Sequence, residues 1–88
     1  MSDSESLLKF PCRLPIKVFG RNVPAFRRTT ISIVERHFGS LDATDVSEQL
    51  SRRESYASLT IVVHADSRAQ VDALYRELTS NDDILMVL

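Results

Sequence analysis

The sequence YASLTIVVHA, residues 56–65, alternates apolar with polar or small side chains over most of its length. Leu59, Ile61 and Val63 recur with a period of two, which is typical of a strand with one buried face. The β-branched residues of its second half suit a packed, pleated surface. Because this is the longest such pattern in the chain, we expect it to form a central strand of a sheet.

The segment that follows, SRAQVDALYREL at residues 67–78, predicts an amphipathic helix. Ser67 and Gln70 have the spacing of a capping box, in which two side chains bond backbone N–H groups at the helix start. Apolar residues then recur at i, i+3, i+4 and i+7, namely Val71, Leu74, Tyr75 and Leu78. A turn at 81–83 separates this helix from a short apolar strand at 84–88.

Three further elements are expected before the central strand. A strand is predicted at 14–19, where apolar residues alternate, and residues 20–22 are expected to break it. A helix follows at 24–38, with a proline in its first turn and Gly39 at its end. Its buried stripe is expected to comprise Phe26, Thr30, Ile33, Val34 and His37. The polar, weakly patterned residues 43–53 predict an exposed edge strand.

The expected order is therefore strand, helix, strand, strand, helix, strand. Two split β-α-β units with right-handed crossovers give a four-stranded antiparallel sheet in the spatial order 4-1-3-2, with both helices on one face. The fold class is α+β, with ferredoxin-like βαββαβ topology. We expect residues 1–88 to form a single domain. Residues 1–6 are expected to be frayed, and Leu7, Leu8 and Phe10 to form a lead-in that packs against the domain.

The composition is that of an ordinary soluble globular protein, with 43% hydrophobic and 26% charged residues. A net charge of −1 provides no global basic field to attract nucleic acid or anionic lipid. Cys12 is the single cysteine, which points to a reducing compartment. The sequence has neither an apolar run of about 20 residues nor the pattern of a signal peptide. We therefore expect a cytoplasmic protein without membrane contact.

Three stretches together resemble a known family: LLKFPCRLPIKVFG at 7–20, VERHF at 34–38 and VDALYRELTSNDDILMVL at 71–88. The chain is similar to the YbeD-like family of small, uncharacterised bacterial proteins, colinearly from about Leu7 to Leu88. The resemblance implies a fold like that of ACT regulatory domains, in agreement with the order of elements above. It implies no particular reaction.

ACT domains often bind amino acids at the loop after their first strand, in a motif similar to G-x-D-R-P-G. Residues 20–25, GRNVPA, resemble this motif in outline. Two positions depart from it, since Asn22 replaces the acidic residue and Ala25 the second glycine. Gly20, Arg21 and Asn22 are therefore the candidate ligand-binding residues, and an amino-acid sensor is one alternative function.

Enzyme chemistry is not expected from this sequence. A nucleophile needs a base and the base an orienting group, whereas Cys12 lies in a proline-flanked lead-in and His37 and His64 at element ends. A zinc site needs three or four convergent ligands, and these residues with Asp66 are scattered. We expect no metal and no cofactor.

The sheet face away from the helices offers a second alternative, a single-stranded RNA binder. Lys17 and Phe19 on the first strand and Tyr56 on the third would lie on this face, where RNA-binding domains of this fold carry stacking aromatics. The basic-glycine-aromatic motif of those domains is missing. With the near-neutral net charge, this makes nucleic acid an unexpected partner.

The closing strand is apolar on both faces although it should lie at a sheet edge, where charge or proline is usual. Its cover is expected to be the lead-in or, alternatively, a second copy of the chain in a weak homodimer. Leu85 and Val87, with Lys17, Phe19 and Tyr56, form the candidate interaction surface. We therefore expect a non-enzymatic regulatory or interaction module with a protein partner that the sequence does not identify.

Overall fold

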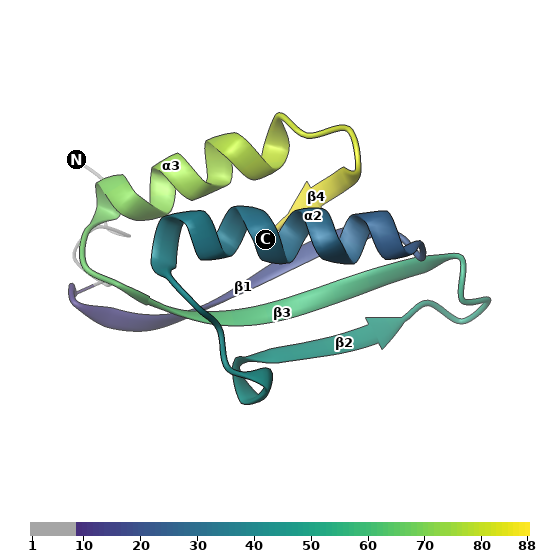
Figure 1. Cartoon of the computed structure of the whole chain (residues 1–88), viewed down its shortest axis with the longest axis horizontal. Helices are drawn as coiled ribbons and strands as arrows, with labels where there is room; N and C mark the ends of the chain where they lie inside the picture. The colour runs from purple at the N-terminus through teal and green to yellow at the C-terminus, as the bar shows by residue number, and fades with distance from the viewer. Residues whose placement is uncertain (1–8) are drawn as a thin grey trace.

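The computed structural model describes residues 9–88. The expectations for residues 1–6 and for Leu7 and Leu8 lie outside the described residues. Within the described part, the chain forms a four-stranded sheet with two α-helices and one short 3₁₀ helix. Both α-helices lie on the same side of the sheet (Figure 1).

The elements follow the expected order along the chain. They are β1 (Cys12–Arg21), α2 (Pro24–Phe38), η1 (Ala43–Asp45), β2 (Val46–Leu50), β3 (Tyr56–Ala65), α3 (Arg68–Thr79) and β4 (Ile84–Val87). Neither α-helix of residues 9–88 combines the length and the apolar character that crossing a bilayer would require.

The sheet order is β2-β3-β1-β4, and every neighbouring pair is antiparallel. Read from the other edge, this is the predicted order 4-1-3-2, so the ferredoxin-like α+β fold is confirmed. β1 and β3 occupy the centre and pair along their full lengths, from Cys12 opposite Ala65 to Arg21 opposite Tyr56. The stretch at residues 56–65 is thus a central strand, as its pattern predicts.

The first strand is longer than predicted. β1 runs from Cys12 to Arg21 rather than over 14–19, and residues 20 and 21 pair with β3 instead of breaking the strand. The sequence missed these ends because the helix-facing positions there are Cys12 and Gly20. The alternation that reveals a strand requires large apolar residues at the buried positions of one face.

The predicted edge strand at 43–53 is wrong at both ends. Residues 43–45 form the turn η1, and β2 covers five residues, Val46–Leu50. The Asp45 carboxylate accepts a hydrogen bond from the Asp42 backbone N–H at 3.4 Å. Four of the five β2 residues are exposed. The sequence of β2 therefore lacks the regular apolar positions from which the bounds of a strand are predicted.

The core lies between the two helices and the helix-facing side of the sheet. Its fully buried large side chains are Phe26, Ile16, Ile61, Leu74, Leu78, Val18, Val34, Val63 and Thr30. The predicted bounds of α2 are confirmed, and Gly39 ends the helix with φ of 86°, in the left-handed region that favours glycine. Of the predicted stripe, His37 alone is half-buried rather than buried.

A variant of the predicted capping box begins α3. Ser67 Oγ accepts a hydrogen bond from the Gln70 backbone N–H at 3.2 Å, as expected. The Gln70 side chain, however, bonds the N–H of Asp66 at 2.9 Å instead of that of Ser67. Its Nε2 also donates to the His37 carbonyl at 3.1 Å. Gln70 therefore ties the start of α3 to the end of α2.

Candidate functional site

The sheet face away from the helices, called the open face here, is built by the period of two in its strands. On β1 the buried residues Ile16 and Val18 face the helices, so the odd-numbered residues face the other way. The pairing of the strands places alternate residues of β3 and β2 on the same side. The open face thus includes Arg13, Lys17, Phe19, Arg21, Ser47, Gln49, Tyr56, Ser58, Thr60, Val62 and His64.

Three of the predicted interaction residues meet on the open face. Lys17, Phe19 and Tyr56 line one shallow pocket of about 190 Å³, together with Gln49 and Ser58. The ammonium group of Lys17 lies 5.6 Å from the centre of the Phe19 ring, close enough for a cation–π contact. The strand pattern of the sequence did not predict that Gln49 belongs to this cluster, because the alternation of apolar and polar residues in β2 is too weak.

The apolar edge strand β4 is exposed over much of its length. Leu85, Met86 and Leu88 expose 54%, 48% and 62% of their surface, whereas Ile84 is buried. Val87 lies opposite Val18 and is half-buried against the core. The two predicted residues of this strand therefore differ, because Leu85 is accessible and Val87 faces the helices. Met86 and Leu88, which the prediction did not select, add to the accessible apolar surface of Leu85.

A register shift separates Phe19, which pairs with Met86, from Gly20, which pairs with Ile84. Leu85 is the additional residue of this bulge. Beyond the bulge the ladder continues, since the backbones of Lys17 and Leu88 exchange two hydrogen bonds of 3.1 and 2.8 Å. Residues alternate along an antiparallel ladder, so Val87 directs its N–H and C=O away from β1, toward the sheet edge.

The candidate ligand residues at 20–22 do not form a separate loop. Gly20 is the close neighbour of the Phe26 ring, with which a Cβ atom at this position would collide at 2.2 Å. Arg21 lies at the end of β1 on the open face. Core packing therefore accounts for the glycine that resembles the ACT motif.

Asn22 connects three segments through its backbone and side chain. Its N–H donates to the Ser55 carbonyl at 3.0 Å, and its Nδ2 donates to the Glu54 carbonyl at 2.7 Å. Its Oδ1 accepts a hydrogen bond of 2.7 Å from Arg27 Nη2. The amide thus joins the β1–α2 turn to the turn between β2 and β3, which favours a structural role for this residue.

Arg27 continues this network to β2. Its Nε donates to Glu48 Oε1 at 2.7 Å, and Nη2 pairs with the other carboxylate oxygen. The hydrogen bond from Arg27 lowers the pKa of Glu48 below its ordinary value, and the bond to Glu48 raises the pKa of Arg27. The pair fastens β2 to α2, where Glu48 lies on the helix side of the sheet.

A second charged cluster links the two helices. Glu77 of α3 contacts both Arg36 and His37 at the end of α2, with 2.8 Å between His37 Nε2 and Glu77 Oε1. The hydrogen bond with His37, and then the charge of Arg36, lower the pKa of Glu77. Residues 9–88 contain no group of three or more His, Cys, Asp or Glu side chains arranged to hold a metal ion.

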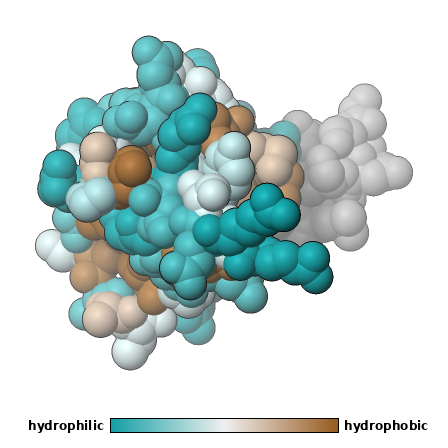
Figure 2. Space-filling model, turned by 90° about the vertical axis from the view of Figure 1, so that its right-hand side faces the viewer, coloured by the Kyte–Doolittle hydropathy of each residue, from teal (hydrophilic) through white to brown (hydrophobic). Residues whose placement is uncertain are grey.

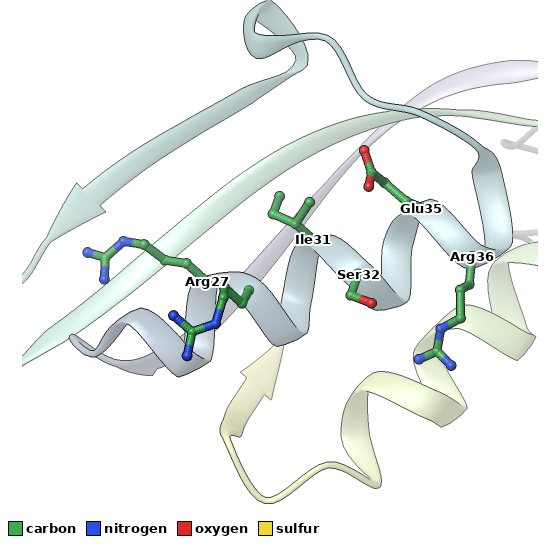
Figure 3. Close-up of a pocket in the computed structure, with 6 residues that line it drawn as sticks. Arg27, Ile31, Ser32, Glu35 and Arg36 are labelled. Carbon is green, nitrogen blue, oxygen red and sulfur yellow. The ribbon is translucent and has the colours of Figure 1, made fainter.

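A further depression lies on α2, apart from the open face. It has a volume of about 720 Å³, and Figure 3 shows Arg27, Ile31, Ser32, Glu35 and Arg36 spread along the helix that lines it. Every lining residue belongs to α2. Viewed from the end with the β2–β3 turn, the surface is largely hydrophilic, with separate hydrophobic patches (Figure 2). Because one helix alone lines the depression on α2, we take the open face and the β4 edge as the candidate sites.

The fold and these surfaces define the class of protein: a small α+β protein of ferredoxin-like topology with one sheet face and one apolar edge exposed. Residues 5–88 match the family described as "Protein of unknown function (DUF493)", and the chain belongs to this family. The match confirms the resemblance to the YbeD-like family of uncharacterised bacterial proteins.

Relatives in several bacteria have nearly the same length as this chain. A UPF0250 protein of Paraburkholderia phytofirmans is 39% identical over 87 residues, which cover 99% of this chain and 98% of the relative. A second UPF0250 protein, from Nitrosomonas europaea, is 37% identical over 84 residues, covering 96% and 97%. A third, from Vesicomyosocius okutanii, is 37% identical over 87 residues, covering 99% and 95%. These names state no reaction, ligand or partner.

Proposed function

We propose that this protein is a small cytoplasmic, non-enzymatic interaction module that binds an extended segment of a partner protein along β4. The observation that carries the proposal is the accessible apolar surface of Leu85 and Met86 on the edge strand β4 and of Leu88 directly after it. Apolar side chains at an edge strand are unusual, because exposed edges invite pairing with another chain. A cytoplasmic location is supported by the free thiol of Cys12.

The backbone of β4 supports binding by strand addition. Val87 presents its N–H and C=O at the sheet edge, where an added strand would form main-chain hydrogen bonds. Apolar side chains of the partner would pack on Met86 and Leu88 on the open face. The bulge at Leu85 interrupts the regular edge of β4, so we expect the added strand to pair around Val87, beyond the bulge.

The proposal is tested by comparing captured proteins for two tagged variants in cell extract. Leu85→Lys combined with Met86→Lys places two charges on the accessible part of β4 and should abolish capture of the partner. Arg76→Ala changes an exposed residue of α3 and should leave capture unchanged. With the purified partner, the backbone amide of Val87 should exchange with solvent at least tenfold more slowly in the complex.

Two results would contradict the proposal. One is an unchanged set of captured proteins for the Leu85→Lys, Met86→Lys variant. The other is exchange of the Val87 amide at the same rate with and without the bound partner, which would place the interaction elsewhere on the molecule.

A further inference from the structure

The open face carries a row of basic side chains along β1. Arg13, Lys17 and Arg21 all lie on it, at intervals of four residues. With about 3.3 Å per residue, the row is about 26 Å long. The Arg13 and Arg21 side chains are exposed and that of Lys17 is half-buried, so all three guanidinium or ammonium groups lie at the surface.

No acidic side chain of the sheet offsets this row. Glu48 is the one acidic residue of the four strands, which all lie within residues 9–88, and it faces α2, where it binds Arg27. Within those residues, none of the three basic side chains on β1 has an ion-pair partner. Although the net charge of the chain is −1, the charged side chains on this face of the sheet are all basic.

Stacking and hydrogen-bonding groups lie beside the basic row. Tyr56 exposes 48% of its surface and is the cross-strand neighbour of Arg21. The pocket of about 190 Å³ at this point also contains Phe19, Gln49 and Ser58. An aromatic ring can stack on the flat face of a base, and an amide can both donate to and accept from its polar edge. Nearby cations can bind the phosphates of the nucleotide.

We propose that the open face binds single-stranded nucleic acid. One base occupies the pocket against Tyr56, with its polar edge toward Gln49, and the sugar-phosphate backbone follows Arg21, Lys17 and Arg13 along β1. Single strands are bound in this way without sequence preference, by a basic track that follows the phosphates and aromatic side chains that stack with bases. The site lies on β1, β2 and β3, so it does not depend on the proposed function of β4.

This proposal departs from the expectation that the sequence provides. That expectation used the net charge of the whole chain and the missing basic-glycine-aromatic motif. Within residues 9–88, however, the acidic residues lie mainly on helices and turns, and the length of β1 adds Arg13 and Arg21 to the open face. The distribution of charge over the faces, rather than its sum, decides whether a polyanion is attracted.

The test is fluorescence anisotropy with labelled oligo-U and oligo-dT of about 12 nucleotides, a length within the range of such sites. We expect saturable binding to a single strand, weaker binding to a duplex of the same length, and a slope of log K against log salt of about −2 for three phosphate contacts. Arg21→Gln should reduce the magnitude of this slope by about 0.7. A preference for oligo-U over oligo-dT, or the reverse, identifies the class of nucleic acid.

Two further variants separate stacking from charge. Tyr56→Ala should weaken binding about tenfold with an unchanged salt dependence, because it removes a ring and no charge. Arg28→Gln removes one exposed positive charge from α2, on the other side of the sheet, and should leave binding unchanged. Circular dichroism checks that each variant is folded.

Several outcomes would overturn the proposal. The first is the lack of saturable binding at about 100 μM protein in low salt, where even a weak site is measurable. The second is an equal effect of Arg28→Gln and Arg21→Gln, which would indicate attraction by general charge. The third is unchanged binding by Tyr56→Ala together with full displacement by an acidic peptide of equal charge, which would assign the face to a protein partner.

Discussion

The Phe26 ring lies directly against the backbone of Gly20. A Cβ atom at residue 20 would approach Phe26 Cδ1 to 2.2 Å, far closer than van der Waals contact allows. Phe26 is fully buried, so its ring has little room to move aside. We expect Gly20→Ala to lower the free energy of unfolding by about 1–3 kcal/mol, the usual cost of overpacking a core. Urea unfolding at equilibrium measures this loss.

A double-mutant cycle provides the control for this prediction. In a Phe26→Leu background the smaller side chain leaves space at Gly20, and Gly20→Ala should then cost less than in the wild type. If the cost is the same in both backgrounds, the Phe26 ring is not the reason for glycine at this position.

The hydroxyl group of Thr30 is buried without a hydrogen-bond partner in the described part of the chain. A buried polar group that is not bonded lowers stability by about 1–3 kcal/mol. Thr30→Val replaces the hydroxyl with a methyl group of similar shape, so it should raise the free energy of unfolding by about 1 kcal/mol. Thermal and urea unfolding both report the change. A decrease in stability would mean that Oγ1 of Thr30 does have a partner in solution.

The side chain and the backbone of Asn22 both attach the turn that follows β1 to the β2–β3 turn. Asn22→Ala removes the 2.7 Å bonds to the Glu54 carbonyl and to Arg27 Nη2. We expect it to lower the free energy of unfolding by about 1–2 kcal/mol. The neighbouring substitution Arg21→Ala, at an exposed side chain, should change stability by less than about 0.5 kcal/mol. Equal losses for the two variants would contradict the structural role of Asn22.

The resemblance to ACT domains suggests an amino-acid sensor with its site at residues 20–22. A ligand that binds the folded protein raises its unfolding temperature. The polar groups of Asn22 already have partners within the protein, and Gly20 contacts Phe26. A thermal-shift screen with the common amino acids at millimolar concentration tests whether the protein is an amino-acid sensor. If no amino acid raises the unfolding temperature, the sensor function has no support.

The contact between α2 and α3 should make stability depend on pH. The pKa of Glu77 in the folded protein lies below the ordinary 4.5, first because of its hydrogen bond with His37 and then because of the Arg36 charge. A carboxyl with a lowered folded-state pKa stabilises the fold above its unfolded-state pKa, and this contribution is lost as the pH falls through the lowered value. The stability difference between wild type and Glu77→Gln should therefore be largest near pH 7 and shrink in acid.

Urea unfolding from neutral to acidic pH measures this difference. Arg76→Gln is a suitable control, because it changes the charge of the same helix by one unit at an exposed position. Its difference from the wild type should vary little over this range. A Glu77→Gln difference that is constant with pH would show that the contact with His37 and Arg36 is not formed in solution.

At the scale of elements, the sequence predicted those helices and strands whose buried side chains recur with a regular period. The bounds of α2 and the buried stripe of α3 followed from apolar residues with helical spacing, and β3 from its period of two. β2 was misplaced because its side chains are almost all exposed. The Arg27–Glu48 pair was not predictable either, because these residues are 21 positions apart and meet only through the register of β2 against β3.

At the scale of the whole molecule, the sheet separates two kinds of surface. The predicted residues Lys17, Phe19 and Tyr56 do lie together, since a period of two places them on one side of neighbouring strands. Gln49, Arg13 and Arg21 complete this face. The sequence analysis did not place them there, because it ended the first strand at 14–19 and found only a weak pattern in the edge strand. Apolar surface is concentrated instead at β4, so the open face is basic over β1 and apolar at its β4 edge.

The apolar edge makes a second copy of the chain the simplest partner of β4. Two copies could associate through their β4 edges, by antiparallel pairing around Val87 and contact between their Met86 and Leu88 side chains. We expect a weak homodimer whose mass, measured by light scattering after size exclusion, rises with concentration. Val87→Lys is unsuitable as a test, because Val87 packs against the core. Leu85→Lys with Met86→Lys should be monomeric and folded.

The opposite edge of the sheet provides a matched control for self-association. Leu50 is an exposed apolar residue of β2, the strand at that edge. Leu50→Lys should leave the dimer intact, because it places a positive charge at the edge opposite β4. If the wild type remains monomeric up to about 1 mM, the weak end of the affinity scale, a second copy is not the partner of this edge. Strand addition at β4 would then require a different protein, whose binding segment must be apolar.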